Sequence, residues 1–420
     1  MPQTDLIKSI KDLISIKSVE SQAKENMPFG EGVFNALNYF LELAKSFGFK
    51  TINYDNYIGE VVYGSGEEIA ILCHLDTVPE GSGWTYPAFS ATVANGRIYG
   101  RGAVDDKSAA VICLYALKKL KEENFAPEKC IKLIVGCDEE SGWKCIEHYK
   151  QKAKLPDTGF SPDSDFPVIY AEKGILHIDM EFEIIGNNIK EFSGGNAANM
   201  VCDYAEAVFE KTNNELLKEY GLITENGKII SKGKSAHGST PHLGKNAIEP
   251  IVKYLVQTES IDKDAYRILF DKDYELKKLN DETGYLTLSP DMVKIQDKKI
   301  IFTVDIRYPA TIKEKEITDI LDCTGKSYKI LSHQPPLYND KNSPLIQTLL
   351  KVYNEVMGTQ EKPISIGGGT YARALKFGVA FGPEFAGEVS TVHQADEFIE
   401  LEKIDILSEI YYNAIKELIR

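Results

Sequence analysis

The sequence predicts an α/β protein: a doubly wound domain on a mixed, mainly parallel sheet, carrying an inserted α+β domain. Between residues 30 and 174, helix-spaced segments alternate with short apolar runs, as in buried strands joined by helices. After residue 174, strand-like segments alternate apolar and polar residues, which is typical of a sheet with one solvated face. A length of 420 residues also exceeds what a single core usually supports, so two domains are expected.

The first element expected is an amphipathic helix through Leu6, Ile10 and Leu13. The elements expected after it are a helix at 33–47, a strand at 69–74, a helix at 107–121, strands at 131–137 and 168–171, strands at 175–185 and 300–307 with helices at 200–211 and 246–257, and helices at 343–356 and 401–419. The change of texture after Gly174 and the break at Pro335-Pro336 set the domain boundaries. The doubly wound domain comprises residues 1–174 and 337–420, and the inserted domain comprises residues 175–336.

Composition excludes several classes of partner. The 63 acidic and 48 basic residues give a net charge of −15, and no stretch gathers basic residues with aromatic ones, so we expect no nucleic-acid partner. No run of eighteen apolar residues occurs, and the N-terminal segment has no basic region, long apolar core or cleavage site, so we expect neither a membrane span nor export. Seven scattered cysteines form no disulfide framework, and the expected location is the cytoplasm.

Residues able to bind metals follow the predicted strands. His74 and Asp76 close the apolar run 69–73, and because residues two apart on a strand share a face, Asp76 can accept the second ring N–H of His74. Considered alone, His74 could equally be a hydrogen-bonded histidine at a strand end. Asp105 and Asp106 begin a helix, where one aspartate can cap the backbone and the other is left to turn inward and bridge two metal ions.

A second set of acids follows the next strands. Glu139 and Glu140 close the run that ends at Cys137, and their diverging side chains would allow Glu140 to bind metal while Glu139 acts as a general base. An ordinary acidic turn is the alternative interpretation of this pair. Asp163 lies in a loop bounded by prolines, with Asp165 as a competing candidate.

His393 would supply a second imidazole from near the end of the chain. Two histidines, one bridging aspartate and two further acids would give each of two metal ions three protein ligands. Such a pair lowers the pKa of a shared water and polarises a carbonyl group, which predicts amide hydrolysis.

Six motifs carry a resemblance to a known family. They are His74-Leu75-Asp76-Thr77-Val78-Pro79, Gly100-Arg101-Gly102-Ala103-Val104-Asp105-Asp106-Lys107, Asp138-Glu139-Glu140-Ser141-Gly142, Ser161-Pro162-Asp163, Ser235-Ala236-His237-Gly238-Ser239 and Thr391-Val392-His393-Gln394. The chain resembles the co-catalytic metallopeptidases related to aminoacylase and carboxypeptidase G, and within them the PepV/Sapep-type bacterial dipeptidases. The resemblance implies that the doubly wound domain is catalytic and that the inserted domain is a lid.

The resemblance also implies residue roles. It assigns His74, Asp105 and Asp163 to one metal, and Asp105, Glu140 and His393 to the other. A cis peptide bond is implied between Asp105 and Asp106. It further implies that Glu139 is the base, that Asp76 orients His74, that His237 donates to the oxyanion, and that Asn199, Arg307 and Gly368 bind substrate, Arg307 through its fork to the free carboxylate and Gly368 through a backbone amide.

The function expected is therefore that of a metal-dependent dipeptidase, in which a metal-bridging water activated by Glu139 attacks the peptide bond. The alternative is a deacylase of N-acyl amino acids with the same two-metal core, and a metal-binding protein without activity is a more distant one. Two divalent ions are expected, zinc first and manganese or cobalt as alternatives, because imidazole and carboxylate ligands suit all three. The partner is a small dipeptide, and the choice between monomer and homodimer stays open.

Overall fold

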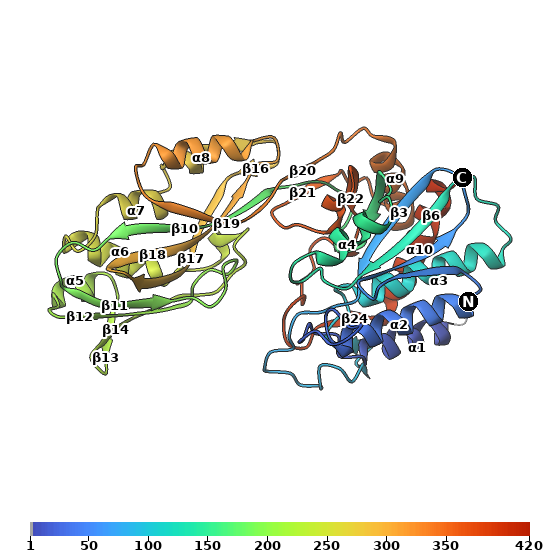
Figure 1. Cartoon of the computed structure of the whole chain (residues 1–420), viewed down its shortest axis with the longest axis horizontal. Coiled ribbons are helices and arrows are strands. Elements are labelled where there is room, and N and C mark those ends of the chain that lie inside the picture. The colour runs from blue at the N-terminus through green and yellow to red at the C-terminus, as the bar shows by residue number, and fades with distance from the viewer. Residues whose placement is uncertain (1–2) are drawn as a thin grey trace. The chain divides into compact units, whose positions relative to one another are not determined.

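The computed structural model describes residues 3–420, so Met1 and Pro2, at the start of the segment expected to lack a leader, lie outside the described residues. The chain forms two compact units (Figure 1). Unit 1 contains the chain up to Tyr170 together with Asn339–Ile364 and Thr370–Arg420, and unit 2 contains Ala171–Tyr338 and Ser365–Gly369.

Unit 1 is built on a mixed sheet. The strand order is β1 (Lys50–Tyr54), β2 (Ile58–Tyr63), β6 (Cys130–Gly136), β3 (Glu68–His74), β7 (Thr158–Ser161), β22 (Phe377–Ala380) and β9 (Ile169–Glu172), the strand within which the two units divide. The central strands β6, β3, β7 and β22 run parallel to one another, whereas β1 and β2 on one side and β9 on the other pair in antiparallel fashion. The parallel centre places the carboxyl ends of β6, β3 and β7 at one edge.

Helices cover both faces of this sheet. They are α1 (Gln3–Ile14), α2 (Glu31–Ser46), α3 (Lys107–Glu122), α4 (Lys144–Lys152), α9 (Pro344–Met357) and α10 (Leu401–Leu418). Gly59 of β2 faces Leu37 and Leu41 of α2, whereas its neighbour Glu60 accepts a hydrogen bond from Tyr149 of α4. Because successive strand residues point to opposite faces, α2 and α4 lie on opposite sides. The predicted doubly wound α/β fold is confirmed.

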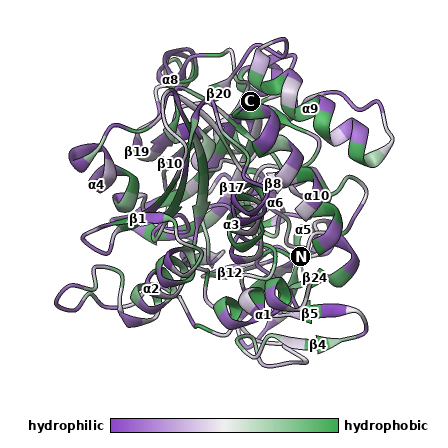
Figure 2. Cartoon of the chain, turned by 90° about the vertical axis from the view of Figure 1, so that its right-hand side faces the viewer, coloured by the Kyte–Doolittle hydropathy of each residue, from purple (hydrophilic) through white to green (hydrophobic). Residues whose placement is uncertain are grey.

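The helices of unit 1 are amphipathic. In α9 the buried residues Ile346, Leu349, Val352 and Tyr353 recur at helical spacing, and hydrophobic and hydrophilic residues alternate along α9 and α10 (Figure 2). The buried stripe supplies most of the stability of such helices, because their packing contributes more than intrinsic propensity does.

Unit 2 is an antiparallel sheet packed on helices. Its strand order is β13 (Ile223–Glu225), β14 (Lys228–Lys232), β12 (Tyr204–Phe209), β11 (Ile189–Gly194), β17 (Thr287–Gln296), β18 (Lys299–Tyr308), β10 (Gly174–Glu183) and β19 (Tyr328–Gln334), with helices α5 (Asn214–Glu219), α6 (Ile248–Gln257), α7 (Asp264–Leu269) and α8 (Glu314–Asp322). Leu176, Ile178 and Met180 of β10 are buried in one core with Ile251 and Leu255 of α6. The predicted α+β arrangement is confirmed.

The remaining elements are short. They are β4 (Thr92–Ala94), β5 (Arg97–Tyr99), β8 (Ser164–Asp165), β15 (Asn280–Asp281), β16 (Gly284–Tyr285), β20 (Leu337–Tyr338), β21 (Ile364–Ile366), β23 (Pro383–Glu384) and β24 (Phe398–Glu400), and the 3₁₀ turns Pro241–Leu243, Glu275–Lys278 and Tyr371–Ala374.

One expected element is wrong. The helix predicted at 200–211 is instead β12, whose residues Ala205 and Ala207 are buried while Tyr204 and Glu206 face outward. β12 pairs with β11 on one side and β14 on the other. Two ladders of backbone hydrogen bonds therefore override the helical preference of this alanine-containing segment. No helix within residues 3–420 is long and apolar enough to cross a membrane.

Gly174 provides a test of packing in unit 2. It is paired with Tyr308 across β10 and β18, and a Cβ atom at this glycine would lie 2.0 Å from the Tyr308 ring, whose hydroxyl is 2.7 Å from Nε2 of His333. We expect Gly174→Ala to lower the free energy of unfolding by about 1–3 kcal/mol, because the ring must move. Urea unfolding of Gly174→Ala in the wild-type and Tyr308→Leu backgrounds would measure it, and an equal loss in both would contradict the explanation.

Candidate metal centre

Acidic and imidazole side chains gather at the carboxyl edge of the unit 1 sheet. His74 is the last residue of β3, Glu139 and Glu140 follow β6, and Asp163 follows β7. Because these parallel strands are neighbours in the sheet, their ends deliver the four side chains to one place.

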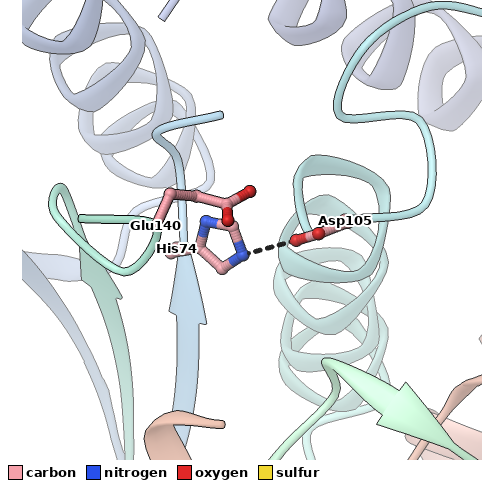
Figure 3. Close-up of side chains that lie close together, drawn as sticks. All are labelled: His74, Asp105 and Glu140. Carbon is pink, nitrogen blue, oxygen red and sulfur yellow. Dashed lines mark hydrogen bonds and ion pairs between the residues drawn. The ribbon is translucent and has the colours of Figure 1, made fainter. Parts of the chain in front are cut away.

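His74 and Asp105 form the centre of the cluster. Nε2 of His74, a fully buried residue, lies 2.7 Å from Oδ1 of Asp105 and 3.7 Å from Oδ2 of Asp163. Figure 3 shows the His74 imidazole facing the carboxylate of Asp105, with the Glu140 side chain beside the ring. The cis peptide bond implied between Asp105 and Asp106 is confirmed.

The other oxygen of Asp105 faces His393. Its Oδ2 lies 2.9 Å from Nε2 of His393, and the same nitrogen is 3.2 Å from Oε1 of Glu140. Asp105 thus contacts both imidazoles through different oxygens, which is the geometry that a bridging carboxylate requires. The His393 side chain is 51% exposed, so this side of the cluster is open to solvent.

The donor atoms fit divalent metal ions. Within the described residues, ligand atoms of His74, Asp105 and Glu140 lie within 4.8 Å of one another, as do those of His74, Glu139 and Asp163. Nitrogen and carboxylate oxygen donors suit zinc, manganese and cobalt. These two groups share His74. The ion-pair distances indicate a different division, in which each histidine belongs to one centre and Asp105 contacts both histidines. The ion-pair division is preferred, because one imidazole nitrogen does not serve two ions.

Asp165, the alternative to Asp163, belongs to neither group. It lies in β8, opposite Glu384 of the neighbouring parallel strand β23.

Asp76 has a different principal contact from the one expected. Its side-chain Oδ1 is 3.6 Å from Nδ1 of His74, whereas its backbone carbonyl oxygen is 3.0 Å from that nitrogen. The Asp76 carboxylate accepts hydrogen bonds from the backbone N–H groups of Glu139, at 3.2 Å, and Glu140, at 3.1 Å. This buried carboxylate consequently fixes the turn from which both glutamates project.

Asp106 does not cap helix α3 as one of the paired aspartates was expected to do. It occupies the N-cap position without a capping hydrogen bond, and its fully buried carboxylate accepts from the backbone N–H of His74 at 3.2 Å. Both aspartates therefore turn inward, Asp105 to the cluster and Asp106 to the strand behind it.

The charges of the cluster shift its pKa values. Burial lowers the pKa of His74, but the carboxylates of Asp163 and Asp105 outweigh it and raise that pKa well above its usual range. Burial likewise opposes protonation of His393, and hydrogen bonds to Asp105 and Glu140 raise its pKa to about 11. The same imidazolium neighbours lower the pKa of Asp105 against the effect of burial. In the absence of metal, protons on the histidines therefore balance the carboxylates.

The remaining carboxyl groups hold protons more strongly. Burial, followed by the charge of Asp105, raises the pKa of Asp163 to about 7. Burial, followed by the charge of Asp163, raises the pKa of Glu139 well above its usual range. Bound cations would lower the pKa values of these carboxyl groups, because a nearby positive charge favours the ionised carboxylate.

The residues expected to bind substrate or the oxyanion, Asn199, His237, Arg307 and Gly368, belong to unit 2, where the segments of Asn199 and His237 lie together. The backbone N–H of Gly238 donates to the carbonyl oxygen of Asn199 at 2.7 Å, which joins the Asn199 turn to the His237 segment. Nδ1 of His237 accepts the backbone N–H of Ser239 at 3.2 Å, so the ring proton of a neutral His237 is on Nε2.

The guanidinium of Arg307 already has hydrogen-bond partners within unit 2. Its Nε and Nη2 donate to the two carboxylate oxygens of Asp305, at 2.7 and 2.9 Å, and Nη1 donates to the carbonyl oxygen of Gly367 at 3.0 Å. The Nε edge of the guanidinium is thereby committed to Asp305, and the edge between Nη1 and Nη2 is the one able to face a carboxylate. The adjoining Gly368 is half-buried in the same unit.

Sequence reasoning missed one buried acid near the cluster, Glu397. It lies four residues after His393, immediately before the apolar pair Phe398-Ile399, and its carboxylate is in the loop that carries Asp105. An acid directly before an apolar pair and close to a candidate ligand was the available signal.

Comparison with known proteins gives a consistent family. Residues 70–417 match the model of peptidase family M20/M25/M40. The protein named "Putative dipeptidase YtjP" from Bacillus subtilis is 39% identical over 99% of this chain and 97% of its own length. A Staphylococcus aureus protein with the corresponding name, MW1694, is 33% identical over the same shares of the two chains.

Solved structures share the fold. Human carnosine dipeptidase 1 matches with a TM-score of 0.63 and 14% identity, covering 99% of this chain and 96% of its own. The YXEP protein of Bacillus subtilis, described as a dinuclear metal-binding peptidase, matches with a TM-score of 0.55 and 11% identity over 99% and 98% of the two chains.

Metal affinity should rise with pH. The raised pKa values of His74 and His393 favour protonated imidazoles at neutral pH in the metal-free cluster, and a metal ion must displace these protons. We expect affinity to increase about tenfold per pH unit for each proton released. Calorimetry of zinc binding in buffers of different ionisation enthalpy measures the release, and binding without proton release would contradict the prediction.

A matched pair of variants assigns these protons. His393→Ala should release fewer protons on binding, whereas His148→Ala, which removes a histidine of α4 paired with Asp55 at 2.9 Å, should not change the number.

Asp76→Asn should weaken metal binding by about 10–100-fold, because one of the two backbone N–H groups of Glu139 and Glu140 would face an amide donor instead of an oxygen. Equilibrium dialysis with metal analysis measures the affinity. Asp157→Asn, at an exposed acid before β7, is the control expected to bind as wild type does, and unchanged affinity in Asp76→Asn would refute the role of this carboxylate.

Proposed function

The chain belongs to peptidase family M20/M25/M40, and from that membership we propose that it is a metal-dependent dipeptidase that hydrolyses the peptide bond of dipeptides. The observation that carries this proposal is that Asp105 contacts His74 through one oxygen and His393 through the other. Glu139, in the same cluster, is an acid that can act as a base. The relatives named as dipeptidases support the choice of substrate.

We assign His74, Asp105 and Asp163 to one metal ion, and Asp105, Glu140 and His393 to the other. The distances between imidazole nitrogens and carboxylate oxygens within each set, from 2.7 to 3.7 Å, support this division. A bound ion would take the place of the protons between these atoms. Zinc is the first candidate, with manganese or cobalt as alternatives. When bound, the two cations would lower the pKa of a water molecule and polarise the substrate carbonyl group.

Glu139 is the proposed general base. It follows Asp138, whose carboxylate accepts the backbone N–H groups of Gly142, at 3.0 Å, and Lys144, at 2.7 Å, so the turn is held from both of its ends. Asp76 holds the backbone N–H of Glu139 itself. In the reaction, Glu139 accepts a proton from the attacking water and returns it to the leaving amine.

We propose that unit 1 is the catalytic domain and that unit 2 is the lid that supplies substrate-binding groups. His237, with its ring proton on Nε2, is suited to donate to the developing oxyanion. Arg307 would bind the free carboxylate of the dipeptide through its terminal nitrogens, with the backbone of Gly368 and the side chain of Asn199 as further contacts. We further propose a cytoplasmic location and leave monomer and homodimer as the two assemblies to test.

Substrate panels test the function. Metal-stripped protein with and without added zinc or manganese would be assayed for release of free amino acids from dipeptides and from N-acetyl amino acids. We expect metal-restored cleavage of dipeptides. Cleavage of acetylated compounds alone would identify a deacylase instead, and no metal-dependent turnover of either would refute both enzyme functions.

Glu139→Gln should lower kcat by about 10²–10⁴-fold while metal binding is retained, because the amide cannot accept the proton. The matched control is Glu147→Gln, at an exposed acid of α4, which should have wild-type kcat. Wild-type turnover by Glu139→Gln would exclude this residue as the base.

A further inference from the structure

We infer that Glu397 is a positioning residue that holds the Asp105 loop against the His393 segment and thereby forms the half-site of Asp105, Glu140 and His393. The inference rests on the proposed metal-dependent function. It assigns a role to a side chain that is not itself a metal ligand in the proposed site.

The Glu397 carboxylate collects donors from one loop. Its Oε2 accepts Nη1 of Arg101 at 2.7 Å and the backbone N–H of Gly102 at 3.2 Å. Its Oε1 accepts the backbone N–H groups of Val104 at 2.9 Å and Asp105 at 3.3 Å. Four donors thus converge on two oxygens, which matches the acceptor capacity of an ionised carboxylate and of no neutral side chain.

Burial makes these contacts consequential. Glu397 is fully buried and Arg101 is 2% exposed, so neither charge can be satisfied by water if the other is removed. The pair also closes the loop on itself, because Arg101 begins the segment whose last residue, Asp105, binds the same carboxylate. Glu397 therefore binds the backbone N–H of Asp105, and the Asp105 side chain stays available to the imidazoles.

The same segment carries His393. β24 pairs with β5 in antiparallel register, Phe398 opposite Tyr99 and Glu400 opposite Arg97, and the backbone N–H of Gly100 donates to the carbonyl oxygen of Glu397 at 2.9 Å. The two strands are therefore joined up to the point where the carboxylate enters the loop.

Beyond that point the chains diverge to their metal ligands and meet again where Oδ2 of Asp105 lies 2.9 Å from Nε2 of His393. Glu397 stands between the paired strands and this contact. Its backbone is joined to the paired strands and its carboxylate binds the Asp105 loop, so it fixes the position of that loop relative to the strands.

The two half-sites depend on Glu397 unequally. His74 is the end of β3 and Asp163 follows β7, and both are fixed by the central sheet. His393 is 51% exposed and reaches Asp105 from outside that sheet. Asp105 serves both ions, but the first ion keeps two ligands fixed by the sheet, so loss of the Glu397 contacts should weaken binding of the second ion much more than of the first.

Zinc alone is the probe. Apo protein would be dialysed against defined free zinc concentrations and the ions bound per chain counted by elemental analysis, for wild type, Glu397→Gln, Glu397→Asp and Glu400→Gln. Glu400→Gln is the matched control, because Glu400 pairs with Arg97 at 2.9 Å in the same two strands but does not reach the loop.

We expect wild type and Glu400→Gln to bind two ions alike. Glu397→Gln should keep one ion at near wild-type affinity and bind the other at least tenfold more weakly, with kcat reduced more than KM is raised. Glu397→Asp, which keeps the charge but withdraws it from the amides, should fall between them. Adding Arg101→Gln to Glu397→Gln removes the unpaired buried cation, and it should restore thermal stability without restoring the second ion.

Equal weakening of both ions, or recovery of the second ion in the stabilised double variant, would show a merely structural role and overturn the inference. Two-ion binding of wild-type affinity by Glu397→Gln would also overturn it and would leave the dipeptidase proposal intact. If Glu397→Gln does not fold, Glu397→Asp decides by the same criterion. Failure of wild type to bind zinc would refute the proposed metal-dependent function itself.

Discussion

The structure of the centre follows from the repulsion among buried carboxylates. Ligand atoms of Glu139 and Asp163 lie within 4.8 Å of each other around His74, as do those of Asp105 and Glu140. At about 4 Å, two like charges repel by about 4 kcal/mol when the effective dielectric constant is about 20. Several such pairs would oppose folding unless cations lie between them. In the metal-free protein the raised pKa values of His74, His393, Asp163 and Glu139 favour the protonated forms of these groups, and divalent ions would replace the protons.

The acids around the centre fall into two kinds that differ in their hydrogen bonds. Asp76, Asp106, Asp138 and Glu397 accept backbone N–H groups of the strand, turns or loop beside them. The acids of the cluster itself contact imidazoles instead. Backbone donors stabilise a buried carboxylate without a counter-ion, so acids of the first kind are able to orient the loops while the others keep oxygens for cations.

Unit 2 uses the same device with the charges reversed. Arg307 is held by Asp305 through two donors of its guanidinium, and its third nitrogen binds the carbonyl oxygen of Gly367. A buried arginine so fixed loses little further conformational entropy when its remaining edge meets a carboxylate. The position of Asp305 against Gly238, where an added Cβ would lie 2.2 Å from its oxygen, keeps the His237 segment beside the same pair.

The sequence by itself determined the fold class, the longer helices, the strands β3, β6, β9, β10 and β18, and the acids at the strand ends, because apolar periodicity reports which face of each element is buried. It failed at β12, where pairing with β11 and β14 outweighs local preference. The family resemblance, and no local pattern, implied that Asp105 lies near His393, whereas only the tertiary structure decided that Asp76 binds the backbone of the glutamate turn and that Glu397 enters the loop of Arg101. Those contacts join segments far apart in the chain, and packing sets them where no local pattern records them.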